Sequence, residues 1–181
     1  MIPVTVQGFI SAPREELFEF IADYGVRPAW CDHFMDDYRL AHPDARGEGA
    51  GARYLLDAPG YEHYVEATIA EADAPRRIVE ALRGGRNGRT RGELAWELSR
   101  ESGGTTRVEV TFANEPGTPR EAFKERFGAR GWSRRQFKTA LERLRVIFEE
   151  RPDQPLARAS VAGYEPLRAP RFGASPRIAR G

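Results

Sequence analysis

The stretch RTRGELAWELSRESGGTTRVEVTF, residues 89–112, decides the fold of this chain. In both halves of the stretch, apolar side chains alternate with polar or charged ones, as they do in a strand with one buried face and one wet face. Between the halves, Ser102-Gly103-Gly104 supplies residues that tolerate turn geometry. The stretch therefore predicts two antiparallel neighbours whose buried positions are Leu94, Trp96, Leu98, Val108, Val110 and Phe112.

Toward the N-terminus, the sequence continues as short β-like runs, separated by turn signals such as Ala58-Pro59-Gly60 and Asp73-Ala74-Pro75. A first strand carries Val4, Val6 and Ile10 on one face. Further strands are expected near 36–42, 50–57, 61–72, 77–83, 89–100 and 105–113. In a chain of 181 residues, such a series of short strands predicts an antiparallel meander.

Helical patterns flank this meander. Ser11-Ala12-Pro13 followed by two glutamates supplies the signals of a helix N-terminus, and Pro28 begins a second short helical piece or turn around Trp30. After the strands, a helical pattern runs over 119–150 and is expected to bend or break at two glycines, Gly128 and Gly131. Its better half places apolar residues at spacings of four, three and four, at Phe137, Leu141, Leu144 and Phe148.

The last helix and the sheet match in size. Residues 130–150 would form a helix about 31 Å long at 1.5 Å per residue. Seven strands at about 4.8 Å spacing would make a sheet about 29 Å wide. We therefore expect an α+β fold in which an antiparallel sheet grips one long C-terminal helix. A space between the two is where a small apolar molecule can be held.

Length and charge divide the chain into a body and a tail. The length predicts one domain with a real core, which we place at residues 1–150. Residues 151–181 carry six Arg against two acidic residues, a net charge of +4, which leaves −3 for the body because the whole chain sums to +1. This Pro-rich segment predicts a flexible tail that is dispensable for folding.

Composition narrows the class of protein. With 40% hydrophobic and 30% charged residues, the chain has the composition of an ordinary soluble globular protein, and no apolar run approaches the roughly 20 residues of a membrane span. The N-terminus lacks the features of a secretory signal, and a single cysteine cannot form an internal disulfide, so a cytoplasmic location is expected. The balanced charge gives no reason to expect nucleic acid as a partner.

Several motifs together resemble the SRPBCC (START/birch-pollen-allergen-like) superfamily, especially its polyketide cyclase/dehydrase and coenzyme Q-binding branch. The resemblance covers about residues 2–150. The segments that carry it are Ile10–Phe18, Ile21–Asp23, Pro28–Trp30, Gly47–Gly51, Ala74–Ile78, Thr90–Leu98, Gly104–Val108 and Leu141–Arg145.

The resemblance implies a helix-grip fold. Such a fold has a seven-stranded antiparallel sheet wrapped around the C-terminal helix, two short helices after the first strand that close one end, and an internal cavity. Members bind lipids, quinones, hormones or polyketides, and some are cyclases, aromatases, chaperone ATPase activators or ribosome-binding factors. The fold alone does not choose among these activities.

Our leading hypothesis is a non-catalytic carrier or sensor for an apolar or aromatic small molecule. Three polar side chains, Tyr54, Tyr61 and His63, would give selectivity. The cavity walls would come from Leu94, Trp96, Leu98, Val110, Phe112, Phe137 and Leu141. Two alternatives remain open: a polyketide cyclase or aromatase in which His63 or a tyrosine moves protons, and a protein-binding module that uses its tail.

Signals for other chemistry are weak. His63 alternates with inward positions and could contact a ligand carbonyl, but the favoured interpretation is a histidine that is partly exposed at a strand end or satisfied by a neighbour. The run Trp30-Cys31-Asp32-His33 holds a possible nucleophile and base, although adjacency in sequence does not create a catalytic pair. One Cys and three His match no structural-zinc spacing, so neither a metal nor another cofactor is expected.

Overall fold

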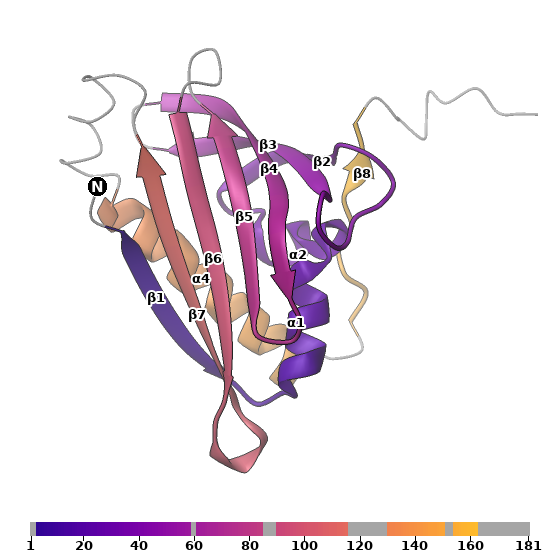
Figure 1. Ribbon diagram of the computed structural model, residues 1–181, viewed down its shortest axis with the longest axis vertical. Helices are drawn as coiled ribbons and strands as arrows, with labels where there is room; N and C mark the ends of the chain where they lie inside the picture. The colour runs from indigo at the N-terminus through magenta and orange to yellow at the C-terminus, as the bar shows by residue number, and fades with distance from the viewer. Residues whose placement is uncertain (1–2, 59–60, 85–89, 116–129, 151–153, 163–181) are drawn as a thin grey trace, which may run out of the picture.

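The computed structural model describes residues 3–58, 61–84, 90–115, 130–150 and 154–162 (Figure 1). Eight strands form one sheet in the order β1-β7-β6-β5-β4-β3-β2-β8. The strands are β1 (Val4–Ile10), β2 (Met35–Leu40), β3 (Gly51–Ala58), β4 (Tyr61–Asp73), β5 (Arg77–Gly84), β6 (Thr90–Arg100), β7 (Thr106–Glu115) and β8 (Ser160–Val161). All pairings are antiparallel except that of β8 with β2.

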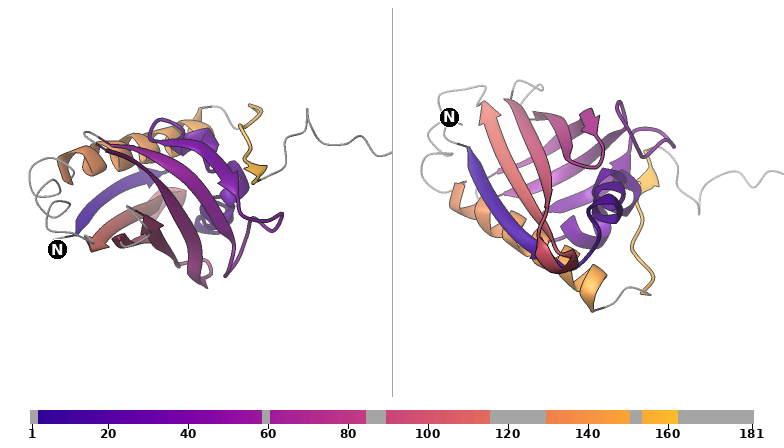
Figure 2. Two further views of the ribbon diagram at one scale, coloured as in Figure 1. Left: turned by 90° about the horizontal axis from the view of Figure 1, so that it is seen from above. Right: turned by 60° about the horizontal axis from the view of Figure 1, so that its bottom comes forward.

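Helices lie on one side of the curved sheet and at one of its ends. The long helix α4 (Arg130–Glu149) runs across the concave side, while α1 (Arg14–Ala22) and α2 (Pro28–Cys31) lie together near β2 and β8 (Figure 2). A short 3-10 helix at Tyr24–Val26 joins α1 to α2. None of the helices among the described residues is both long enough and apolar enough to cross a membrane.

The helix α4 packs closely on the sheet at β1. A Cβ atom added at Gly8 would lie 3.4 Å from Leu141 Cβ, which is ordinary van der Waals contact. The buried face of α4 consists of Ser133, Phe137, Ala140, Leu141 and Leu144. The predicted apolar stripe of the helix is thus confirmed over Phe137, Leu141 and Leu144, while Phe148 at its end is only partly buried.

The predicted α+β architecture, with a large antiparallel sheet and a C-terminal helix, is confirmed, but the predicted number of strands is wrong. The sheet has eight strands because β8 comes from the tail segment. A two-residue strand has no room for an alternating pattern, so sequence periodicity carries no signal for it. The expected helical stretch at 119–129 lies outside the described residues.

The start of the tail segment lies against the body. The Ala159 amide donates a hydrogen bond to the Gly25 carbonyl at 2.8 Å, and the Ala162 amide donates one to the Leu40 carbonyl at 2.7 Å. The Arg158 guanidinium lies 3.8 Å from the buried Asp23 carboxylate. Residues 154–162, which the sequence assigns to a flexible tail, therefore form a strap bound to β2 and to the segment that follows α1. The remaining tail residues, 163–181, lie outside the described part of the chain.

The contacts of the strap indicate that it stabilises the fold, whereas its composition predicts a tail that is dispensable for folding. A chain that ends at Glu150 lacks β8 and the Arg158 contact, so we expect it to melt several degrees below a chain that ends at Ala162, as a loss of about 1–2 kcal/mol would produce. Thermal unfolding followed by circular dichroism measures the difference. Equal melting temperatures would show that the strap adds nothing to the fold.

Candidate functional site

The inner face of the sheet brings the central apolar side chains together. Strand register places Trp96 of β6 beside Ile78 of β5 on one side and Val110 of β7 on the other. Two residues before Trp96 in β6, Leu94 lies opposite Phe112 of β7. All five side chains belong to, or pack against, a single hydrophobic cluster.

Phe137 of α4 links this inner face to the helix. Its ring centroid lies 6.3 Å from that of Trp96 and 6.0 Å from that of Phe112. On its other side it meets Phe34 edge-to-face at 5.6 Å. Contacts at these distances and angles are favourable aromatic pairs, so Phe137 anchors α4 over the sheet.

The sequence-predicted site residues occupy one region, but with different degrees of burial. The buried ones in the common core are Tyr54, Leu94, Trp96, Leu98, Val110, Phe137 and Leu141. His63 and Phe112 are only partly buried. Tyr61 begins β4, and its side chain lies outside the described part of the structure.

His63 faces inward, as its alternation with Val65 predicts. A Cβ atom added at Gly84 would come within 3.0 Å of the His63 ring and 3.2 Å of Val65 Cγ2, and Val65 is a core residue. The imidazole therefore lies directly over the Gly84 backbone on the inner face of the sheet. Any larger residue at position 84 would push the ring away, so this glycine sets the position of His63.

A buried charged network that the sequence pattern does not predict fills the middle of the interior. Glu80 of β5 is 2% exposed and Arg27 is 1% exposed. Arg27 Nη2 donates to Glu80 Oε1 at 2.7 Å and to the Ile21 carbonyl at 3.1 Å. Trp96 Nε1 donates to Glu80 Oε1 at 2.7 Å, and the Tyr24 hydroxyl donates to Glu80 Oε2 at 2.9 Å. The carboxylate thus accepts hydrogen bonds from three side chains.

Aromatic rings surround the guanidinium of this network. Arg27 Cζ lies 4.7 Å from the Trp30 ring centroid, 5.1 Å from that of Tyr24 and 5.4 Å from that of Trp96. Burial by itself would lower the pKa of Arg27, but Glu80 and the neighbouring Tyr38, Cys31 and Tyr24 side chains together outweigh burial and hold that pKa above its ordinary value. The guanidinium therefore keeps its charge, and the ion pair with Glu80 balances it.

One part of this network had a signal in the sequence. Glu80 takes an inward position of its strand, between the apolar Ile78 and Leu82, and a carboxylate there requires a buried partner. The partner itself had no such signal, because Arg27 lies in the irregular turn between α1 and α2.

The network predicts strong coupling between its two charged residues. Arg27→Met or Glu80→Leu alone should lower the free energy of unfolding by about 3–5 kcal/mol, since each leaves a buried charge unpaired. The double variant should lose much less than the sum of the two single losses. Urea denaturation measures all three.

The control is the exposed pair formed by Arg77 and Glu97, whose charged atoms lie 3.9 Å apart and also link β5 to β6. Its variants Arg77→Met and Glu97→Leu should show coupling of at most about 1 kcal/mol. Additive losses at the Arg27 and Glu80 positions would contradict a coupled buried pair.

The run from Cys31 to His33 does not form a catalytic pair. Cys31 is fully buried, and burial raises the pKa of its thiol to about 12. Burial also lowers the pKa of His33, whose Nε2 lies 3.1 Å from the Gln136 carbonyl and donates to it. The thiol therefore stays protonated at neutral pH, and the imidazole instead joins α2 to α4.

Cys31 should accordingly resist thiol reagents in the folded protein. At pH 8, a disulfide reagent such as DTNB should modify it at least about 100-fold more slowly in native protein than in denaturant, because the thiolate is the reacting species. Absorbance of the released thiol follows the reaction. Rapid labelling without denaturant would contradict the burial of this side chain.

An antiparallel sheet curved around a C-terminal helix, with short helices after the first strand, defines a START-like protein. The chain belongs to the family described as polyketide cyclase / dehydrase and lipid transport, whose model matches residues 1–149. This membership confirms the resemblance to the SRPBCC superfamily. No curated protein matches the chain in sequence.

Solved structures of low sequence identity share the fold. The KanY protein, determined by NMR in solution, is 19% identical, with a TM-score of 0.66 over 82% of this chain and 97% of its own. A START superfamily protein from Mycobacterium smegmatis is 15% identical, with a TM-score of 0.59 over 79% of this chain and 96% of its own. The major latex-like protein 151 of Panax ginseng is 8% identical, with a TM-score of 0.56 over 82% and 97%. At these identities the likeness concerns the fold alone.

Proposed function

We propose that this chain binds one apolar or aromatic small molecule, of lipid, quinone or polyketide type, between the sheet and α4 without changing it chemically. Family membership supports binding of a hydrophobic ligand. The observation that carries the proposal is a change in burial along the inner face. Trp96 and Val110 are 0% exposed, whereas Leu56, His63 and Phe112 are only partly buried.

The partly buried side chains lie at the same end of the sheet. Register pairs Leu56 with His63, and His63 lies over Gly84 at the end of β5. Gly84 pairs with Thr90 at the start of β6. Two residues further along β6, Gly92 pairs with Asn114 of β7, and Asn114 lies two residues beyond Phe112. The two glycines add no side-chain volume there. An apolar ligand at this end would bury Leu56 and Phe112 without displacing the charged network.

Polar selectivity would come from side chains between the fully buried part of the inner face and its partly buried end. Tyr54 is buried and stacks on Tyr38 with a centroid separation of 5.7 Å. Burial raises its pKa, so its hydroxyl remains a hydrogen-bond donor at neutral pH. With the half-buried imidazole of His63, it would favour a ligand that carries a carbonyl or hydroxyl oxygen.

A block at the proposed site tests this assignment. Leu56→Trp should weaken binding of an environment-sensitive dye such as 1-anilinonaphthalene-8-sulfonate at least about tenfold, a change of 1.4 kcal/mol, because the larger ring occupies the ligand space. The wild-type protein should bind about one equivalent. Dye fluorescence measures both quantities, and quinones or flat polycyclic compounds should displace the dye.

Leu55→Trp is the matched control, because Leu55 neighbours Leu56 in sequence but points to the outer face, opposite the exposed Tyr64. It should leave dye affinity within about twofold. Equal effects of the two variants, or no saturable dye binding by the folded wild-type protein, would overturn the proposal. If Leu56→Trp alone weakens dye binding, native mass spectrometry of protein purified from its own host will identify the ligand by mass.

A catalytic role would depend on His63, the half-buried base on the inner face. His63→Ala should keep dye binding if the protein is a carrier. Turnover of a poly-β-keto substrate that is lost in His63→Ala would instead support the cyclase or aromatase alternative.

A further inference from the structure

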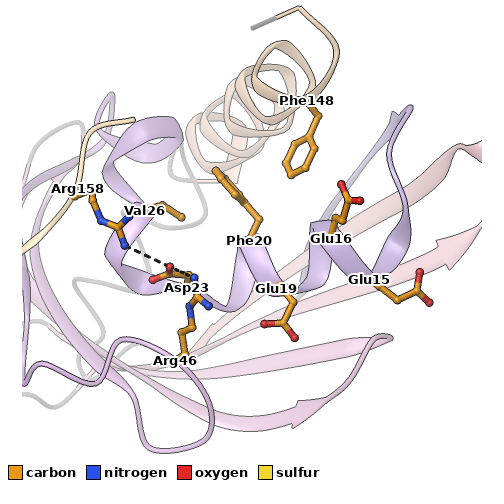
Figure 3. Close-up of a pocket in the computed structure, with 9 residues that line it drawn as sticks. All are labelled: Glu15, Glu16, Glu19, Phe20, Asp23, Val26, Arg46, Phe148 and Arg158. Carbon is orange, nitrogen blue, oxygen red and sulfur yellow. Dashed lines mark hydrogen bonds and ion pairs between the residues drawn. The ribbon is translucent and has the colours of Figure 1, made fainter. Parts of the chain in front are cut away.

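A concave site lies on the outside of the molecule, away from the inner face. A groove of about 500 Å³ lies between α1, the C-terminal end of α4 and the strap. Figure 3 shows the residues that line it. Phe20 of α1 and Phe148 of α4 meet there edge-to-face at 5.1 Å. Both rings are partly exposed, so they offer an apolar floor that no described residue covers completely.

The rim of the groove along α1 is acidic. Glu15, Glu16 and Glu19 line it, and all three are exposed. Glu15 already pairs with Arg100 at 2.6 Å. Glu19 is already attracted to Arg46, which lines the same groove, although the two form no ion pair. The rim therefore presents exposed carboxylates, with Glu16 and Glu19 side by side on α1, that a further cation can approach.

The C-terminal segment already enters this groove. Arg158 of the strap lines the groove and lies 3.8 Å from the Asp23 carboxylate, which is 3% exposed and also accepts a hydrogen bond from Arg46 at 2.7 Å. In Figure 3 both guanidinium groups point to Asp23 from opposite sides. The groove is thus a place where arginine from the end of the chain is bound by the body.

We propose that the tail segment 167–172, Leu-Arg-Ala-Pro-Arg-Phe, docks in the same groove. Its two guanidinium groups, Arg168 and Arg171, would pair with Glu16 and Glu19, while Leu167 and Phe172 would pack on the Phe20 and Phe148 rings. Charge complementarity supports this occupant. Residues 163–181 hold four Arg and one Glu, a side-chain charge of +3, against the acidic rim.

The length of the chain allows this contact. Ala162, the last described residue, lies four residues beyond Arg158 and so within about 14 Å of it, at 3.3–3.6 Å per residue. The six residues from Ala162 to Arg168 can span about 21 Å. Arg168 can therefore return to the groove that Arg158 occupies. This inference does not depend on the ligand proposed for the interior.

A spin label on the tail of the full-length chain tests the docking. Ser175→Cys can be labelled selectively, because the buried Cys31 does not react. Paramagnetic broadening of backbone amides then reports which surface the tail approaches. We expect the amide signals of Glu16, Glu19 and Phe20 to lose at least half of their intensity at low salt and to regain it at 0.5 M NaCl, where exposed charges are screened over a few Å.

Charge reversal supplies the controls. Glu16→Arg with Glu19→Arg should abolish the broadening on α1, and adding Arg168→Glu with Arg171→Glu should restore it. Glu62→Arg with Glu66→Arg makes the same charge change on the outer face of β4 and should have no effect. Broadening that is absent from α1 in the wild-type chain, unchanged in the α1 variant, or not restored by the charge swap would overturn the proposal. Broadening that arises only between a labelled and an unlabelled copy would also overturn it.

Discussion

The ion pair between Arg27 and Glu80 is the interaction on which the rest of the interior depends. It joins the turn between α1 and α2 to the middle of β5, and Trp96 adds β6 to the same carboxylate. Charges removed from water are tolerated only when their partners are placed well. Few placements of the short helices over the sheet would bring such partners to this carboxylate. We regard the pair as a device that fixes that position, and its contribution to net stability as secondary to its contribution to specificity.

This constraint also divides the interior into two halves. Around Glu80, the rings of Tyr24, Trp30 and Trp96 pack against the guanidinium, and all three residues are 0% exposed. Toward the ends of β3, β5 and β7, the inner face carries two glycines and side chains that are only partly buried. A rigid, filled half and an incompletely filled half suit a binding protein, since a preformed wall lowers the cost of ordering a ligand. The charged network would thus support the site from behind without contacting the ligand.

Much of the fold could be predicted from the sequence because its elements are periodic. The alternation of Leu94, Trp96 and Leu98 predicted the strand, the face and the neighbourhood of each side chain. The network, the strap and the outer groove could not be predicted in the same way. Arg27 and Asp23 lie in irregular backbone, β8 has two residues, and Phe20 meets Phe148 across 128 positions of sequence. Such contacts follow from how elements pack, and no local pattern records that packing. The alternation also predicted that His63 faces inward, but it could not predict the unequal burial of the candidate site residues, because burial depends on volumes summed over several strands.

The distribution of charge links the body to its tail. Inside, the charges of Arg27 and Glu80 cancel, so the field outside comes from surface groups such as Glu16 and Glu19 and from the arginines of the C-terminal segment. Attachment at Arg158 and β8 holds the following residues close to the groove. A tethered segment has an effective concentration of about 1 mM. At that concentration, a contact with an intrinsic Kd of about 1 mM, or −4.1 kcal/mol, is occupied about half of the time. Two exposed ion pairs at up to about 1 kcal/mol each, together with partial burial of Leu167 or Phe172, are of that order. A weak groove can therefore hold this tail, whereas the same peptide free in solution at micromolar concentration would leave it empty.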